Sequence, residues 1–301
     1  MEERLTGFVI EADAAAAIAK SAGVAAVADL LPLLVPAAQR LARPPISNYH
    51  VGAVGLGASG RIYIGVNLEF PGVPLHHSVH AEQFLIANAA VHGEAAIRCF
   101  AVSSVPCGHC RQFLQEVRGA AEIRILVTAD GGAAAFRPLS YFLPHPFGPP
   151  DLLADDHPLL LEKHNNKLDY VTDESTPLRP AAAANGVGGL REAAEAAAKA
   201  AHAPYSGCAA GFALADGKGR IFAGSYMESA AYNPSLGPVQ AAMVAWVTAG
   251  GGRFEGIVAA ALVEGEGAAV SHEGTARVLL AAVAPLAELR VYRYWKVAGA
   301  V

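Results

Sequence analysis

The sequence repeats itself at a constant spacing, and this repeat limits the chain to folds built from two copies of one unit. Internal repeats of this kind are the sequence signature of a duplicated structure. A chain of 301 residues is also long enough for two domains of ordinary size, each with its own core. The pairs that share the spacing include Pro45 with Pro204, Ser47 with Ser206, Gly52 with Gly211, Gly65 with Gly224 and Glu69 with Glu228.

The first copy contains two short motifs whose residues can bind zinc. His80 and Glu82 begin an apolar stretch with helical spacing, and Cys107 and Cys110 begin another, directly after the strand-like residues 97–105. Backbone N–H groups at the start of a helix favour thiolates, the form of cysteine that binds metals. One histidine and two thiolates leave one tetrahedral position of zinc open for water, as in catalytic zinc sites. Glu82 is then the candidate proton carrier rather than a ligand.

Two other interpretations of these motifs stay open on local sequence alone. A C-x-x-C pair is also typical of a redox pair or of half a structural zinc site. In a non-enzymatic zinc module, His76, His77 or His109 would be a fourth ligand and would close the site. The upstream His80 and Glu82 favour catalysis, because H-x-E followed by P-C-x-x-C is the signature of zinc-dependent nucleobase deaminases.

Longer stretches of the chain resemble cytidine deaminases, specifically the long homodimeric type with a second, degenerate domain. The resemblance runs from about residue 45 to about residue 240 and is carried by SNYHVGAVGLGASGRIYIGVNLEF, HAEQ and PCGHCRQF. It implies zinc-dependent hydrolysis of cytidine and 2′-deoxycytidine to uridine and 2′-deoxyuridine with release of ammonia, a pyrimidine salvage reaction. In that reaction zinc-bound hydroxide attacks C4 of the base while Glu82 shuttles the protons.

The same resemblance implies residues that contact the substrate and the partner subunit. Asn67 and Glu69 match residues that hydrogen-bond the ribose hydroxyls, and Tyr49 matches an aromatic residue that packs on the pyrimidine. On local sequence alone, Tyr49 is equally typical of an ordinary half-buried aromatic in a hairpin. Phe147 lies in an F-G-P loop that, in the dimeric family, reaches the pocket of the partner subunit. The resemblance therefore implies a homodimer with one zinc ion, held by His80, Cys107 and Cys110, in each chain.

The second copy has lost this chemistry. A comparison by eye pairs Pro238 with His80 and Gln240 with Glu82, and no cysteine follows Cys208. Neither proline nor glutamine binds zinc or carries a proton at neutral pH. We therefore expect a scaffold, a dimerisation surface or a pocket-closing partner. The alternative is a regulatory nucleoside site that uses Glu228.

Strands alternate with helices across residues 51–127, which predicts an α/β fold. With the resemblance, we expect a three-layer α/β/α sandwich of the cytidine deaminase type, duplicated in one chain. The predicted parts are an N-terminal helical segment (1–42), a zinc-dependent catalytic domain (43–150), a linker (151–184) and a degenerate deaminase-like domain without a metal site (185–301).

Charge and composition limit the classes of substrate and partner that the protein can bind. The net charge is −5, and no long run of Lys or Arg is present, which argues against nucleic-acid binding. The nearest rival substrates are a nucleotide or a base within RNA or DNA, but Glu69 would repel a 5′-phosphate. The first residues carry acids and no long apolar segment, and two of the four cysteines have metal-site spacing. We therefore expect a small nucleoside substrate, no membrane association and a cytoplasmic location.

Overall fold

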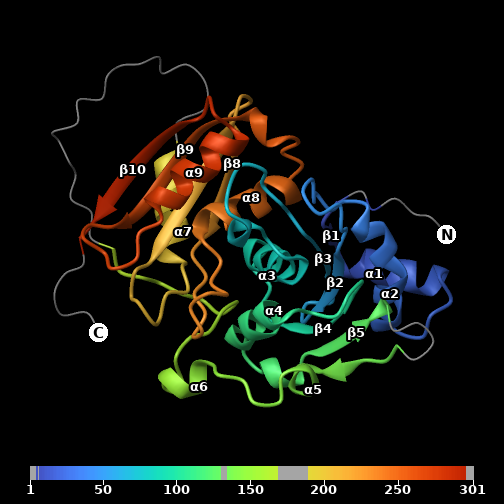
Figure 1. Cartoon of the computed structure of the whole chain (residues 1–301). Helices are drawn as coiled ribbons and strands as arrows, with labels where there is room; N and C mark the ends of the chain where they lie inside the picture. Colours follow the sequence, from blue (N-terminus) through green and yellow to red (C-terminus); the bar gives the residue numbers. More distant parts are fainter. Residues whose placement is uncertain (1–4, 6, 130–133, 169–188, 296–301) are drawn as a thin grey trace. The chain divides into compact units, whose positions relative to one another are not determined.

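The computed structural model describes residues 5, 7–129, 134–168 and 189–295 (Figure 1). The chain divides into two compact units. Unit 1 consists of Met1–Glu162 together with Glu228–Ser235, and unit 2 consists of Lys163–Met227 together with Leu236–Val301. The finer division into helical segment, catalytic domain, linker and degenerate domain stays a prediction.

Unit 1 is built on a mixed sheet, which has six strands among the described residues, in the order β1-β3-β2-β4-β5-β6. The β4–β5 pair is parallel, and the other pairs are antiparallel. The strands are β1 (Val9–Ile10), β2 (Gly52–Gly57), β3 (Ile62–Val66), β4 (Ile97–Val102), β5 (Arg124–Val127) and β6 (Arg137–Pro138).

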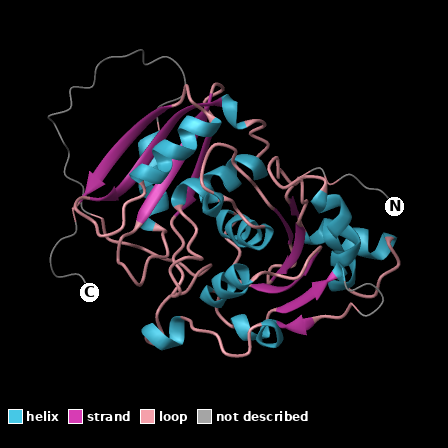
Figure 2. Ribbon diagram, in the orientation of Figure 1, coloured by secondary structure: helices cyan, strands magenta, loops and turns pink. Residues whose placement is uncertain are grey.

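From β3 to β5 one α-helix lies between each pair of consecutive strands, and Figure 2 distinguishes the helices and strands by colour. Residues 12–41, which have helical leucine spacing, form two helices that precede the sheet hairpin. The α-helices are α1 (Ala12–Ser21), α2 (Val27–Gln39), α3 (Ala81–Val91), α4 (Gly108–Phe113), α5 (Leu139–Phe142) and α6 (Pro149–Leu152), and the short 3₁₀ turns are η1 (Leu75–His77), η2 (Leu114–Glu116) and η3 (Ala120–Glu122).

Unit 2 repeats the order of strands and α-helices that runs from α2 to β5 in unit 1. Its sheet has the order β10-β9-β7-β8, with β9 and β10 parallel and the other pairs antiparallel, as in β4-β5 and the β2 hairpin. The predicted α/β class and its duplication are confirmed. The elements are α7 (Leu190–Lys199), β7 (Ala210–Asp216), β8 (Ile221–Ser225), α8 (Pro238–Thr248), η5 (Phe254–Gly256), β9 (Ile257–Gly265), α9 (Glu273–Val283) and β10 (Glu288–Tyr294).

Repeated glycines show that helices cover both faces of each sheet. A Cβ atom at Gly52 would lie 2.7 Å from a backbone nitrogen of α2, and one at Gly65 would lie 2.1 Å from a backbone oxygen of α3. Gly65 pairs with Ala53, the neighbour of Gly52, and successive residues of a strand point to opposite faces. The helices α2 and α3 therefore lie on opposite faces. The same holds in unit 2 for Gly211 with α7 and Gly224 with α8, which makes each unit a three-layer sandwich.

The structure also fixes how the two copies correspond at the candidate zinc motif. In unit 1 a bridge joins Leu68 to Val79, and α3 begins two residues after Val79. In unit 2 an equivalent bridge joins Met227 to Leu236, and α8 begins two residues after Leu236. Because α3 and α8 have the same length, the two helices match residue by residue from these bridges.

This register corrects the comparison made from sequence. The pairing of His80 with Pro238 is wrong by one residue, because Gly237 occupies the position of His80 and Val239 that of Glu82. The conclusion drawn from the pairing is unchanged, since glycine has no side chain to bind zinc and valine has no group that carries a proton.

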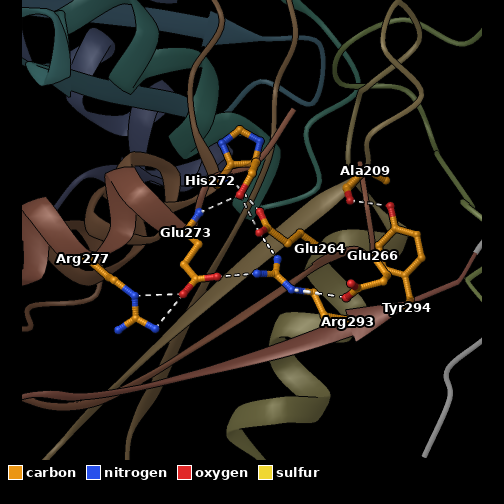
Figure 3. A network of polar contacts seen from close by, with 9 residues as sticks. Ala209, Glu264, Glu266, His272, Glu273, Arg277, Arg293 and Tyr294 are labelled. Carbon is orange, nitrogen blue, oxygen red and sulfur yellow. Dashed lines mark hydrogen bonds and ion pairs between the residues drawn. The ribbon is translucent and has the colours of Figure 1, made fainter. Parts of the chain in front are cut away.

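A polar network joins residues of β9, α9 and β10 in unit 2 (Figure 3). The carboxylate of Glu264 is buried and accepts the backbone N–H of His272 at 2.6 Å. Arg293 lies between Glu264 and Glu273 and donates to both carboxylates. His272 precedes α9 as Cys107 precedes α4, and its ring packs edge-on against Tyr226 at 4.3 Å. His272 therefore occupies in unit 2 the position before the helix that Cys107 has in unit 1.

None of the helices that the structure describes is long and apolar enough to cross a membrane.

Burial of His272 predicts that the stability of the chain falls as the pH falls below neutral. Its Nε2 atom has no hydrogen-bond partner among the described residues, and burial lowers the pKa of the ring to about 4. In the unfolded chain the ring takes up a proton near pH 6.5, so unfolding becomes easier between about pH 6.5 and pH 4. Above this range the effect is absent.

We expect the original protein to lose about 2 kcal/mol of unfolding free energy through this group between pH 7 and pH 5. The His272→Phe protein, which keeps a ring against Tyr226, should lose correspondingly less over the same range. Urea unfolding at both pH values measures the difference. Equal losses in the two proteins would contradict the assignment.

Candidate metal centre and active site

The predicted zinc ligands lie together in unit 1. The Nδ1 atom of His80 is 3.4 Å from the sulfur of Cys107 and 3.3 Å from the sulfur of Cys110, and the two sulfurs are 3.7 Å apart. His80 is the residue that caps α3, Cys107 is the one that caps α4, and Cys110 lies in the first turn of α4. Two helix starts therefore bring the three donor atoms to one point.

These distances fit a tetrahedral zinc ion. Zinc bonds of about 2.3 Å to sulfur and about 2.0 to 2.1 Å to nitrogen place two sulfurs about 3.8 Å apart, and nitrogen and sulfur about 3.6 Å apart. The observed separations lie within a few tenths of an ångström of these values. Imidazole and thiolate are also the donors that zinc prefers over magnesium or calcium.

The ligand group contains three members within the part of the chain that the structure describes, namely His80, Cys107 and Cys110. His76, His77 and His109, the alternatives for a fourth ligand, lie outside this group. The ring of His109 nevertheless packs near that of His80, with centroids 5.1 Å apart, and burial lowers its pKa. Three ligands favour an open, catalytic coordination rather than a closed structural one.

The two cysteines differ in how readily they ionise. Hydrogen bonds from Cys110 and His80 lower the pKa of Cys107 to about 3. The bond to that thiolate, together with burial, raises the pKa of Cys110 well above its ordinary value. These shifts favour the thiolate form of Cys107, and zinc binding would displace the proton that the pair still holds.

Glu82 lies beside the metal ligands and is almost completely buried, with 4% of its surface exposed. Its Oε2 atom is 3.3 Å from the sulfur of Cys110. Burial raises the pKa of the carboxyl group, because a charge loses its hydration in the interior. A carboxyl group with a raised pKa next to an open coordination position can both accept and donate a proton.

Asn67 and Glu69, the predicted ribose ligands, hold the loop before β2 in place. Asn67 accepts the N–H of Val51 and donates to the carbonyl of Tyr49, both at 2.9 Å. Glu69 accepts two backbone N–H groups at 2.9 Å, from residues 46 and 47, and the Ser47 hydroxyl at 2.5 Å. Sequence reasoning missed this role in the loop. These loop contacts still allow Glu69 to bind a substrate hydroxyl group, because a carboxylate can accept about four hydrogen bonds.

Tyr49 is 60% exposed, so it is not an ordinary half-buried hairpin residue. Its hydroxyl group lies 2.6 Å from that of Ser104, which follows β4 on the way to the cysteines. Phe147 is also exposed, and its backbone carbonyl accepts a hydrogen bond from Gln112 of α4. The loops that carry both aromatic residues are thus attached to the segment that provides Cys107 and Cys110.

Two buried polar residues near the site were missed from sequence. Gln83 accepts the backbone N–H of His80 at 3.3 Å, which completes the cap of α3. Its position three residues after His80 was a readable capping signal. Glu116 is fully buried at the end of the turn that continues α4, and no short-range pattern marks it.

The ligand assignment predicts how metal content responds to single cysteine substitutions. We expect Cys110→Ala to weaken zinc binding at least about 100-fold, since even the loss of an outer partner of a ligand costs 10- to 100-fold. Cys99→Ala is the matched control, because Cys99 is an equally buried cysteine of unit 1 that lies outside the ligand group. Zinc per chain, measured after dialysis, tests the prediction. Full occupancy in the Cys110→Ala protein would contradict it.

Comparison with known proteins assigns both halves of the chain to one family. Family models described as "Cytidine and deoxycytidylate deaminase zinc-binding region" match residues 28–126 and 139–277. The chain is 51% identical to "Cytidine deaminase 1" of Arabidopsis thaliana, over 96% of this chain and 98% of the relative. It is 44% identical to "Cytidine deaminase 6" of the same plant, over 88% and 92%, and 40% identical to "Cytidine deaminase" of Pectobacterium atrosepticum, over 82% and 77%.

Proposed function

This chain belongs to the cytidine deaminase family, and from that membership we propose that it catalyses the zinc-dependent hydrolysis of cytidine to uridine and ammonia. The observation that carries the proposal is the group of His80, Cys107 and Cys110 with the buried Glu82 beside it. The spacing of the three donors suits zinc, and a proton carrier next to the ligands suits hydrolysis.

We assign the metal ligands to His80, Cys107 and Cys110, with one zinc ion per chain. When bound, zinc is a Lewis acid that makes water nucleophilic near neutral pH. Glu82 accepts a proton from the attacking water and delivers it to N3 of the pyrimidine ring. It then takes the second proton from the same oxygen, which is now bonded to C4, and passes it to the exocyclic nitrogen, whose bond to C4 breaks as ammonia leaves. Burial of Glu82 supports this double role, because a raised pKa brings its carboxyl group closer to the pH at which it works.

We propose that the same site accepts 2′-deoxycytidine and serves pyrimidine salvage. Asn67 and Glu69 would bind the ribose hydroxyls through hydrogen-bonding positions of their side chains that the contacts within the loop do not use. Tyr49 would pack on the base, a role that its exposed ring supports. The acidic net charge supports a free nucleoside over a nucleic acid, and a cytoplasmic location remains part of the proposal.

The role of Glu82 predicts a large loss of rate with no loss of metal. We expect Glu82→Gln to lower kcat for cytidine at least about 100-fold, because the amide cannot carry the proton. Zinc content should stay at the original level, since Glu82 is not one of the ligands. A Glu82→Gln protein that keeps a tenth of the original rate would contradict the assignment of Glu82 as the proton carrier.

We also propose a homodimer in which Phe147 helps to close the pocket of the partner subunit. Phe147 is 46% exposed, so its side chain is accessible for contact with a partner subunit. The Phe147→Ala protein should show a raised KM for cytidine, by several-fold if the ring covers the base. Tyr141→Ala, which removes another exposed aromatic ring six residues earlier in the chain, is the control. An unchanged KM in the Phe147→Ala protein would count against the role.

A further inference from the structure

A segment from the second half of the sequence belongs to the unit that carries the candidate active site. Glu228–Ser235 groups with unit 1, although its sequence neighbours Met227 and Leu236 belong to unit 2. The two ends of the segment are joined by the bridge between Met227 and Leu236. The second copy, which lacks the metal ligands, thus supplies a short piece of chain to the unit that has them.

This segment is braced by its own hydrogen bonds. The N–H of Ser229 donates to the hydroxyl of Ser235 at 2.9 Å, and the N–H of Tyr232 donates to the carbonyl of Ser229 at 2.8 Å. Tyr232 has a positive φ of 61°, which a non-glycine residue adopts only where its surroundings require it. A loop held in this way can act as a fixed spacer.

One end of this spacer binds α3 and the other binds the turn that continues α4. Gln83 of α3 donates to the carbonyl of Pro234 at 2.9 Å, and its own oxygen accepts the N–H of His80. Glu116, in the turn after α4, accepts the N–H of Ala230 at 2.7 Å. Both of these bonds to the segment are buried. The segment therefore connects the two helices whose first turns carry the zinc ligands and Glu82.

The bond to Glu116 is the stronger of the two. A carboxylate that accepts a backbone N–H makes a charge-assisted hydrogen bond, roughly twice as strong as a neutral one. Glu116 has no exposed surface, so an unpaired carboxylate there would be costly. An apolar residue at this position would leave the buried N–H of Ala230 without this acceptor. A carboxylate at this position is best explained by the geometry that it holds.

We propose that Glu116 is a positioning residue of the deamination reaction, which rests on the proposed function. By holding Glu228–Ser235 against the turn after α4, it fixes Cys107 and Cys110 relative to His80 and Glu82. Glu116 touches neither the metal nor the substrate in this role. It acts through the segment and Gln83.

The test compares Glu116 with Glu94, a second buried carboxylate of unit 1. Glu94 accepts bonds from Ser59 and Tyr63 at the far end of α3, away from the ligands. The assay temperature is set well below the melting temperature of each variant. We then expect Glu116→Ala to lower kcat for cytidine about tenfold or more, since small misplacements of catalytic groups cost up to about 100-fold. Glu116→Gln, which can still accept the N–H of Ala230, should recover most of the rate. Glu94→Ala should lose comparable stability and keep kcat within about twofold.

A readout that does not depend on activity separates this inference from the proposed function. Cobalt replaces zinc in such sites, and its visible absorption reports ligand geometry. The cobalt spectrum of Glu116→Ala should differ from that of the original protein, and the spectrum of Glu94→Ala should not. Identical spectra and rates in Glu116→Ala and the original protein would overturn the proposal, as would equal changes in both variants. If the original protein does not deaminate cytidine, the proposed function fails, and the spectra still decide the role of Glu116.

A milder variant covers the case in which Glu116→Ala does not fold. Gln83→Met removes the second bond to the segment, the one to Pro234, together with the bond from the N–H of His80, and keeps a long unbranched side chain in the helix. We expect a fall in kcat of about fivefold with zinc retained, because one helix is then free to shift. An unchanged kcat and an unchanged cobalt spectrum in this protein would overturn the proposal.

Discussion

The meeting of two helix starts at one point is the constraint on which the rest of unit 1 depends. The helices α3 and α4 bring an imidazole and two sulfurs within 3.7 Å of one another, and a buried carboxylate comes to 3.3 Å from one sulfur. A divalent cation at this point would balance the charge of two thiolates, and its binding would release the proton that Cys110 holds. The glycine at position 65, which lets α3 lie directly on β3, and the caps at both helix starts serve this meeting point.

Unit 2 shows which features of the fold are kept where the metal ligands are absent. The sheet order, the covering helices and the close-approach glycines are kept, so they are requirements of the fold rather than of the reaction. Glycine replaces the ligand His80, valine replaces the proton carrier Glu82, and the buried carboxylate of Glu264 is paired with Arg293. Unit 1 itself includes one segment from the second half of the sequence, Glu228–Ser235.

Most of the site could be predicted from sequence, because its residues lie in two short motifs at the starts of helices. The ligands, Glu82 and the duplicated α/β fold follow from such local patterns. The exact match of the two copies at α8 could not be found, because it depends on loop lengths that only the bridge from Met227 to Leu236 reveals. The bond from Glu116 to Ala230 joins residues far apart in sequence, and no local pattern encodes it. For the same reason, the loop contacts of Asn67 and Glu69 were missed.

The central claim is that one zinc ion and the residues around it deaminate a free nucleoside. Ultraviolet absorbance of cytidine with the purified protein tests it most directly, run beside the same protein after zinc chelation and beside cytidine monophosphate. The account predicts loss of the cytidine band only with zinc present and only for the nucleoside. No change with either substrate, in a protein that contains one zinc ion per chain, would contradict it and would indicate a structural metal site.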